Sequence, residues 1–180
     1  DIGLYRIYKF GNQIDEVTNI SEYWRNDLVS FLLGCSFTFE NALIESGIEL
    51  RHISQNRNVP MYITNIPTIP AGIFSGPMVV SMRPIKRDHL VKTIQITSRF
   101  PSVHGAPIHF GDPSDIGIKD LSAPDFGDSV EVKDDEIPTF WACGVTPQSV
   151  AMSSKPPLMI THSPGYMFIT DHIDEDFAVI

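Results

Sequence analysis

Two histidines stand where this sequence could place an acid–base catalyst. His162 follows an apolar stretch and precedes a Ser-Pro-Gly turn, so its ring should lie at a strand end. We expect it to transfer protons, with Asp171 orienting the ring, whereas the structural alternative is a ring nitrogen bonded to a nearby carbonyl. His104, in a loop with Gly105 and Pro107, is the second candidate. The remaining histidines are expected on the surface or in a small lobe: His52, His89, His109 and His172.

A short sequence pattern occurs twice, once at each of the two cysteines. Cys35-Ser-Phe-Thr-Phe-Glu40 lines up with Cys143-Gly-Val-Thr-Pro-Gln148, and each segment follows an apolar stretch and opens a predicted helix. Two related strand–turn–helix crossings would place both cysteines at the carboxyl ends of neighbouring strands, where backbone N–H groups bind anions. A helix dipole there would lower the pKa of each thiol. The alternatives are a chance similarity and inert buried thiols.

Several polar groups are candidates for binding a carboxylate. Arg57 and Asn58 share a polar loop, and Arg83 and Arg99 are further cations that could hold an anion. The candidate catalytic residues are His162, Cys143, His104 and Asp171. The candidate substrate-binding residues are Cys35, Ser36, Arg57, Asn58, Gly144, Thr146 and Tyr166.

Metal and nucleotide chemistry find no support in the motifs. No C-x-x-C, H-x-x-x-H or H-E-x-x-H spacing occurs, and neither does a glycine-rich phosphate motif. We therefore expect no metal and no organic cofactor. The formal net charge of −9 argues against nucleic acid or an anionic membrane as a partner.

The elements that must position these residues alternate between strands and helices. A hairpin is predicted from Leu4–Phe10 and Gln13–Thr18 around Gly11-Asn12. Further strands are predicted at Leu28–Gly34, Met61–Thr64, Met78–Arg83, Pro107–Phe110, Ser129–Lys133, Thr139–Ala142, Leu158–Thr161 and Met167–Thr170. Helices are predicted at Phe37–Ser46, at His89–Phe100 and from Thr146-Pro147 onward, where Thr is the N-cap and Pro the first helical residue.

Six sequence motifs occur in order along nearly the whole chain: Gly34-Cys-Ser-Phe-Thr-Phe-Glu40, Arg57-Asn-Val-Pro-Met-Tyr62, Gly105-Ala-Pro107, Pro124-Asp-Phe-Gly-Asp128, Phe140-Trp-Ala-Cys-Gly-Val-Thr-Pro-Gln148 and Thr161-His-Ser-Pro-Gly165. Together they resemble the D-glutamate cyclase family, whose bacterial members are often named hydro-lyases. Two departures stand out. The family usually carries a further N-terminal segment, and it often has His where this chain has Tyr166, which cannot titrate near neutrality.

The resemblance implies an α/β fold with an inserted lobe, which agrees with a change in the pattern of predicted elements near Gly76 and its return near Pro138. We expect a mixed-sheet, three-layer core formed by residues 1–75 and 137–180, with a smaller α+β two-layer lobe inserted at 76–136. It also implies a lyase that converts D-glutamate to 5-oxo-D-proline and water. The alternatives are a hydro-lyase acting on another small hydroxy or amino acid, and a non-catalytic module that binds an acidic metabolite.

The expected partner is therefore a small acidic amino acid, and a homodimer is the assembly we consider. Only two cysteines occur, which suits a reducing cytosol, and the start of the chain shows no secretory signal pattern. No apolar run approaches the roughly 20 residues that span a bilayer. These features together predict a cytoplasmic protein.

Overall fold

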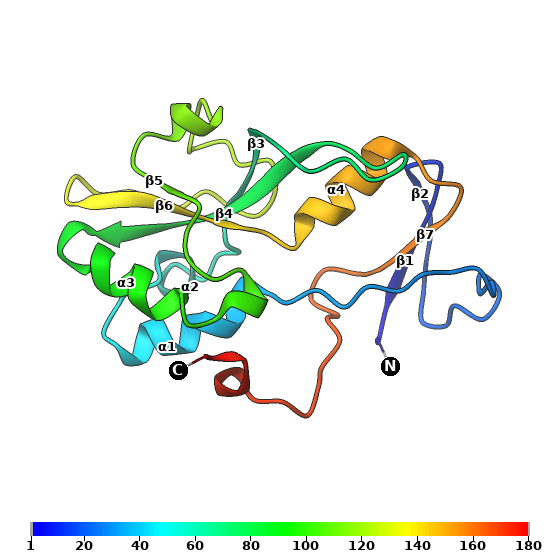
Figure 1. Ribbon diagram of the computed structural model, residues 1–180, viewed down its shortest axis with the longest axis horizontal. Helices are drawn as coiled ribbons and strands as arrows, with labels where there is room; N and C mark the ends of the chain where they lie inside the picture. Colours follow the sequence, from blue (N-terminus) through cyan, green and yellow to red (C-terminus); the bar gives the residue numbers. More distant parts are fainter. Residues whose placement is uncertain (1, 180) are drawn as a thin grey trace. The chain divides into compact units, whose positions relative to one another are not determined.

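The computed structural model describes residues 2–179, and their contacts group into two units. Unit 1 comprises Asp1–Leu32, Ile69–Gly76 and Pro147–His172. Unit 2 comprises Leu33–Thr68, Pro77–Thr146 and Ile173–Ile180. Strands and helices both contribute to the structure (Figure 1), so the predicted α/β class is confirmed.

Unit 1 contains a three-stranded antiparallel sheet in the order β2-β1-β7. The strands are β1 (Tyr5–Lys9), β2 (Asn12–Val17) and β7 (Met159–His162). The predicted hairpin is confirmed, with Phe10 and Gly11 between its strands at φ values of 49° and 81°. Positive φ at both central residues is the geometry of a type I′ turn, which matches the twist of paired strands.

Unit 2 contains a four-stranded sheet in the order β3-β4-β6-β5 (Figure 1). Its strands are β3 (Met61–Pro67), β4 (Pro77–Lys86), β6 (Glu136–Ala142) and β5 (His109–Phe110). Strand β4 pairs with a neighbour on each edge and is buried over most of its length. This double burial explains why its sequence is an almost continuous apolar run.

Four α-helices and five 3-10 helices complete the described chain. The α-helices are α1 (Glu40–Glu45), α2 (Arg51–Ser54), α3 (Leu90–Thr97) and α4 (Val145–Ser154). The 3-10 helices are η1 (Ser36–Phe39), η2 (Arg87–His89), η3 (Pro101–Val103), η4 (Pro113–Ile116) and η5 (Asp174–Phe177). The predicted helix at 37–46 corresponds to η1 and α1 together, and it stops before Gly47 at a φ of 79°. Glycine takes this left-handed conformation without a steric penalty, so the predicted stop signal is confirmed.

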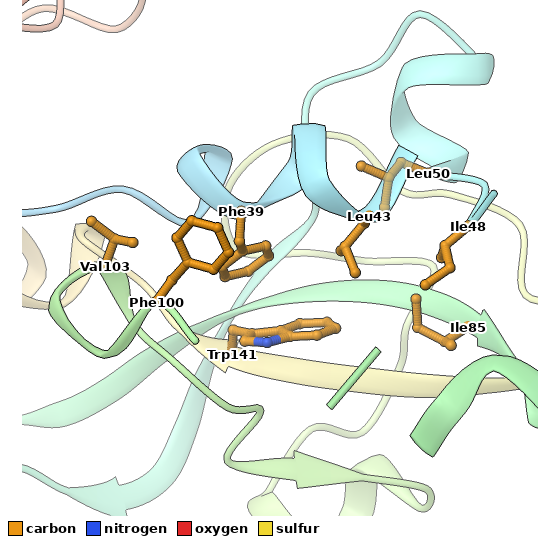
Figure 2. Close-up of a cluster of buried hydrophobic side chains, with 8 residues drawn as sticks. All are labelled: Phe39, Leu43, Ile48, Leu50, Ile85, Phe100, Val103 and Trp141. Carbon is orange, nitrogen blue, oxygen red and sulfur yellow. The ribbon is translucent and has the colours of Figure 1, made fainter. Parts of the chain in front are cut away.

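The two faces of the unit 2 sheet carry separate hydrophobic clusters. On the face covered by helices, Trp141 from β6 packs against Phe39 from η1, with ring centroids 5.5 Å apart (Figure 2). The full cluster is Phe39, Leu43, Ile48, Leu50, Ile85, Phe100, Val103 and Trp141. The second cluster consists of Tyr62, Val80, Met82, Ile116, Ile118, Val130 and Phe140. Alternate residues of β4 and β6 enter different clusters, as the two-residue period of a strand requires.

Three predicted strands do not form. Residues 28–34, 129–133 and 167–170 are irregular, and Phe31 and Leu32 are 77% and 79% exposed. The apolar pattern at 28–34 predicted burial, but no described strand pairs with this segment. An apolar run becomes a buried strand only where a neighbour satisfies its backbone groups.

The sheets also differ from the expected mixed sheet, since every described strand pair is antiparallel. Strand β4 belongs to the predicted lobe, yet it pairs with β3 and β6 on its two sides. Strands from residues 76–136 thus share one sheet with strands outside that range. The boundaries of 76–136 stay a prediction.

A buried ion pair links α2 to the start of β6. The Arg51 guanidinium bonds Glu136, and both side chains are almost fully buried at 4% and 3% exposure. The same guanidinium also faces Glu131, at 3.7 Å, but that carboxylate is 64% exposed. The guanidinium also meets Glu49, at 3.2 Å, whose side chain is 50% exposed. One arginine thus meets one buried and two exposed carboxylates, which allows the effects of burial on stability to be compared directly.

Replacing Glu136 by Gln should lower the free energy of unfolding by about 3 kcal/mol, because it removes the buried counter-ion of Arg51 and leaves only the exposed carboxylates of Glu49 and Glu131. Glu131→Gln should cost less than ~0.5 kcal/mol, since water screens an exposed pair. Urea denaturation of both variants measures the difference. Equal losses in the two variants would show that burial of the pair does not set its contribution.

Candidate functional site

Three segments of unit 2 meet at Gly34. A methyl group at this position would lie 2.5 Å from Val103 Cγ1 and 2.7 Å from the Ser102 carbonyl oxygen, so only glycine permits the approach. A Cβ on Gly144 would lie 3.7 Å from the Gly34 carbonyl oxygen. We call these segments, residues 34–36, 102–105 and 143–144, the site loops. They bring together five of the sequence-predicted candidates: Cys35, Ser36, His104, Cys143 and Gly144.

His104 presents an unpaired ring nitrogen within the site loops. Its backbone is left-handed at a φ of 84°, and its Nε2 is buried without a hydrogen-bond partner among residues 2–179. The ring is hydrogen-bonded to the backbone of Gly34, and this bond favours the protonated ring, as donation to a carbonyl does. In the neutral ring the other nitrogen therefore carries the proton, and Nε2 is a bare acceptor. Burial, together with the charge of Arg83, lowers the pKa of His104 and favours this neutral form.

A fully buried arginine lies beneath the same loops. The Arg83 guanidinium donates from Nε (2.8 Å) and a terminal nitrogen to Glu40 Oε1. It also donates to Ser81 Oγ and Ser36 Oγ, each at 3.1 Å. His52 Nε2 lies 3.1 Å from Glu40 Oε1, so one carboxylate joins an arginine and a histidine.

Aromatic rings enclose this polar cluster. The Arg83 guanidinium carbon lies 5.2 Å from the Phe39 ring centroid and 5.3 Å from that of Trp141, within the range of cation–π attraction. Burial raises the pKa of Glu40, but the hydrogen bond from His52 and the charge of Arg83 outweigh it and hold that pKa below its usual value. Glu40 is therefore ionised at neutral pH, and its charge balances that of Arg83.

The similarity between the two cysteine segments predicted the position of Cys143 but only part of that of Cys35. Cys143 follows β6 directly and precedes α4, whereas Cys35 precedes η1 but follows no strand. Burial raises the pKa of both thiols, and the expected lowering by a helix dipole is wrong. Each thiol is therefore protonated at neutral pH and is a poor nucleophile.

The backbone of the site loops offers unpaired donors. The N–H groups of Ser36 and Gly144 bond no acceptor in the described part of the chain, whereas the Cys143 N–H donates to the Val79 carbonyl oxygen at 3.0 Å. These two N–H groups are therefore available to an anionic oxygen.

The candidates of unit 1 have different surroundings. His162 ends β7 as predicted, but it is exposed and its Nδ1 lies 2.8 Å from the Ser163 carbonyl oxygen. Asp171 is exposed, and no hydrogen bond or ion pair joins it to His162. Tyr166 is exposed and packs near Gly3. The bond to Ser163 is the structural role that we weighed against catalysis for His162.

Three remaining candidates make structural contacts. Arg57 donates to the Ser129 carbonyl oxygen, and the Asn58 backbone N–H bonds Asp128 Oδ2 at 2.9 Å. The Thr146 hydroxyl accepts from the Val79 N–H (2.9 Å) and donates to its carbonyl oxygen (3.0 Å), which fixes the start of α4 to β4. The Thr146 backbone N–H also bonds the Cys143 carbonyl oxygen at 3.0 Å, within the site loops, whereas the contacts given for Arg57 and Asn58 lie outside them.

Sequence reasoning missed two members of the buried cluster and underrated a third. His52, expected at the surface, is 5% exposed because α2 turns it toward Glu40. Glu40 was not singled out, and Arg83 was only one of several cations. The available signal was Arg83 itself, since a charge within an apolar strand requires a buried partner.

No helix within residues 2–179 is long and apolar enough to cross a bilayer. No three or more His, Cys, Asp or Glu side chains in that range are grouped so that they could hold a metal ion.

Comparison with known proteins identifies the family. A family model described as D-glutamate cyclase matches residues 29–171, a range that contains all of the site loops. A Psychrobacter arcticus protein named "Putative hydro-lyase" is 64% identical over 180 residues, which cover 100% of this chain and 68% of the relative. A Thermoanaerobacter protein of that name is 66% identical over 178 residues (99% and 67%), and one from Bacillus licheniformis is 60% identical over 180 residues (100% and 69%). The chain belongs to the D-glutamate cyclase family.

Proposed function

We propose that this protein is a hydro-lyase that converts D-glutamate to 5-oxo-D-proline and water. The observation that carries the proposal is the family match over residues 29–171. The relatives' names support the broader class of hydro-lyase. The site loops add a buried base and two unpaired N–H donors, which suit an acyl-transfer reaction.

The reaction forms one C–N bond and breaks one C–O bond. The α-amino nitrogen of glutamate attacks the side-chain carboxyl carbon, and one carboxyl oxygen leaves. Two protons of the ammonium group end in the departing water, so the organic product keeps a single negative charge. The attack is intramolecular, and a site that holds the chain folded removes much of its entropic cost. The balance requires no oxidant and no nucleotide.

His104 is our first candidate for the base. Its neutral ring offers Nε2 as an acceptor while the other nitrogen is held by Gly34. It can take a proton from the substrate ammonium and return one to the leaving oxygen. The Ser36 and Gly144 N–H groups would then stabilise the tetrahedral oxyanion. Cys143, as a neutral thiol beside Gly144, is a candidate proton donor, and Cys35 lines the same loops.

A second candidate function is dehydration of a small hydroxy acid, which the relatives' printed name favours. That reaction takes a proton from carbon and expels a hydroxyl from the neighbouring carbon. It therefore yields an alkene, whereas cyclisation yields a lactam. Analysis of the product by NMR separates the two, and binding without turnover would identify a non-catalytic module.

The base can be assigned by comparing three histidine variants. His104→Asn should reduce kcat for D-glutamate by about 10²–10⁴-fold, the usual contribution of a positioned acid–base group. Asparagine also tolerates the left-handed backbone at this position. His109→Asn, which loses a bond to the Asp112 carbonyl oxygen outside the site loops, should stay within about twofold of wild type.

His162→Asn tests the sequence-predicted alternative in the same assay. A loss confined to His162→Asn would move proton transfer to unit 1. A wild-type protein that converts neither D- nor L-glutamate to 5-oxoproline would contradict the cyclase proposal itself.

The pH profile gives an independent test of His104. The base must be neutral, so activity should be full above its pKa and fall as pH drops through it. Because the pKa of His104 lies below its ordinary value of 6.5, the acid limb of kcat/KM should be centred below pH 6.5. The limb should disappear from any residual activity of His104→Asn. A limb centred above pH 6.5, or one that persists in the variant, would exclude His104 as the titrating base.

A further inference from the structure

Arg83 determines the direction of the hydrogen bond at Ser36. Arginine has donors and no acceptor, so the Ser36 oxygen must accept the bond at 3.1 Å. The hydroxyl hydrogen of Ser36 is then left to donate elsewhere. Ser36 is only 4% exposed, and its hydroxyl donates to no acceptor among residues 2–179. A buried donor without an acceptor costs free energy unless a ligand supplies one.

The guanidinium that orients Ser36 is itself immobilised. Glu40 accepts two of its N–H groups, and the rings of Phe39 and Trp141 enclose it. A fixed guanidinium leaves the Ser36 oxygen little freedom to shift. The Ser36 oxygen is therefore held in place before any ligand arrives, and its hydroxyl hydrogen can turn to an acceptor.

Ser36 lies in the same short segment, residues 34–36, whose Gly34 backbone bonds the His104 ring. The His104 ring bonds Gly34, two residues before Ser36, and its Nε2 has no partner. The Ser36 hydroxyl, a donor, and His104 Nε2, an acceptor, thus both lie at the segment 34–36. The chemistry that satisfies both is an oxygen anion on a molecule that also carries an N–H group, as an α-amino acid does.

We propose that the Ser36 hydroxyl binds a carboxylate oxygen of the substrate, and that Arg83 is the positioning residue that holds this hydroxyl in place. The proposal deepens the function proposed above and rests on it for the identity of the ligand. It makes Ser36, and not Arg83, the direct side-chain contact for the anion, because four of the five Arg83 N–H donors already bond Glu40, Ser36 and Ser81.

Ser81 provides a matched control. It accepts from the same guanidinium at the same 3.1 Å and is fully buried, but it lies within β4 and outside the site loops. If Ser36 served only Arg83, Ser36→Ala and Ser81→Ala would behave alike. If Ser36 binds the anion, Ser36→Ala alone should weaken binding of glutarate and D-glutamate by roughly 10- to 100-fold, the effect of one hydrogen bond to a charged group.

Isothermal titration calorimetry measures the Kd of each variant for glutarate and D-glutamate, and kinetic assays measure kcat/KM for D-glutamate. We expect Ser81→Ala to keep the wild-type Kd within about twofold and Ser36→Cys, a weak donor of similar shape, to lose affinity as Ser36→Ala does. Arg83→Lys should raise the Kd while thermal unfolding still shows a folded protein. Wild-type affinity in Ser36→Ala or Ser36→Cys, equal losses in Ser36→Ala and Ser81→Ala, or a wild type that binds neither probe would overturn the proposal. Wild-type binding without turnover would leave it standing and refute the cyclase function.

Discussion

A guanidinium with no exposed surface must find its counter-charge inside the protein, and in unit 2 this requirement organises the site. Arg83 lies at the middle of the central strand and bonds Glu40 at the start of α1. Desolvating two charges costs several kcal/mol, and their attraction returns this only when geometry and hydrogen bonds are good. Arg83 donates to the hydroxyl oxygens of Ser36 and Ser81, and His52 contacts Glu40. These bonds, with the aromatic rings around the guanidinium, meet that condition.

The ion pair also sets where the site loops lie. It fixes the junction of η1 and α1 over the sheet, and the chain that enters this junction is the loop of Gly34. Gly34 in turn contacts Val103 and the ring of His104. The Arg83–Glu40 pair thus positions the segment that contacts His104, the proposed base, and that contains Ser36, the proposed anion donor. Its partners are separated by 43 residues in sequence, so the site forms only when the fold does.

Local sequence signals predicted the local features of this structure. The hairpin at Gly11 and the helix stop at Gly47 were predicted because each needs a backbone conformation that few residues adopt. The strand predicted at 28–34 does not form, since an apolar run does not say whether a neighbouring strand exists. Residue type and loop chemistry selected His104, but the Glu40–His52 contact arises from tertiary packing that no spacing encodes. The elevated pKa of each thiol likewise follows from burial, which the sequence pattern around the cysteines could not predict.

The central claim is that the Arg83–Glu40 pair serves the site more than it serves stability. A double replacement, Arg83→Met with Glu40→Leu, tests it most directly, because buried ion pairs can often be exchanged for apolar groups without loss of stability. The account predicts that the double variant unfolds at or above the temperature of either single variant, yet loses at least about 10²-fold in kcat/KM for D-glutamate. A folded double variant that retains wild-type kcat/KM would contradict the account.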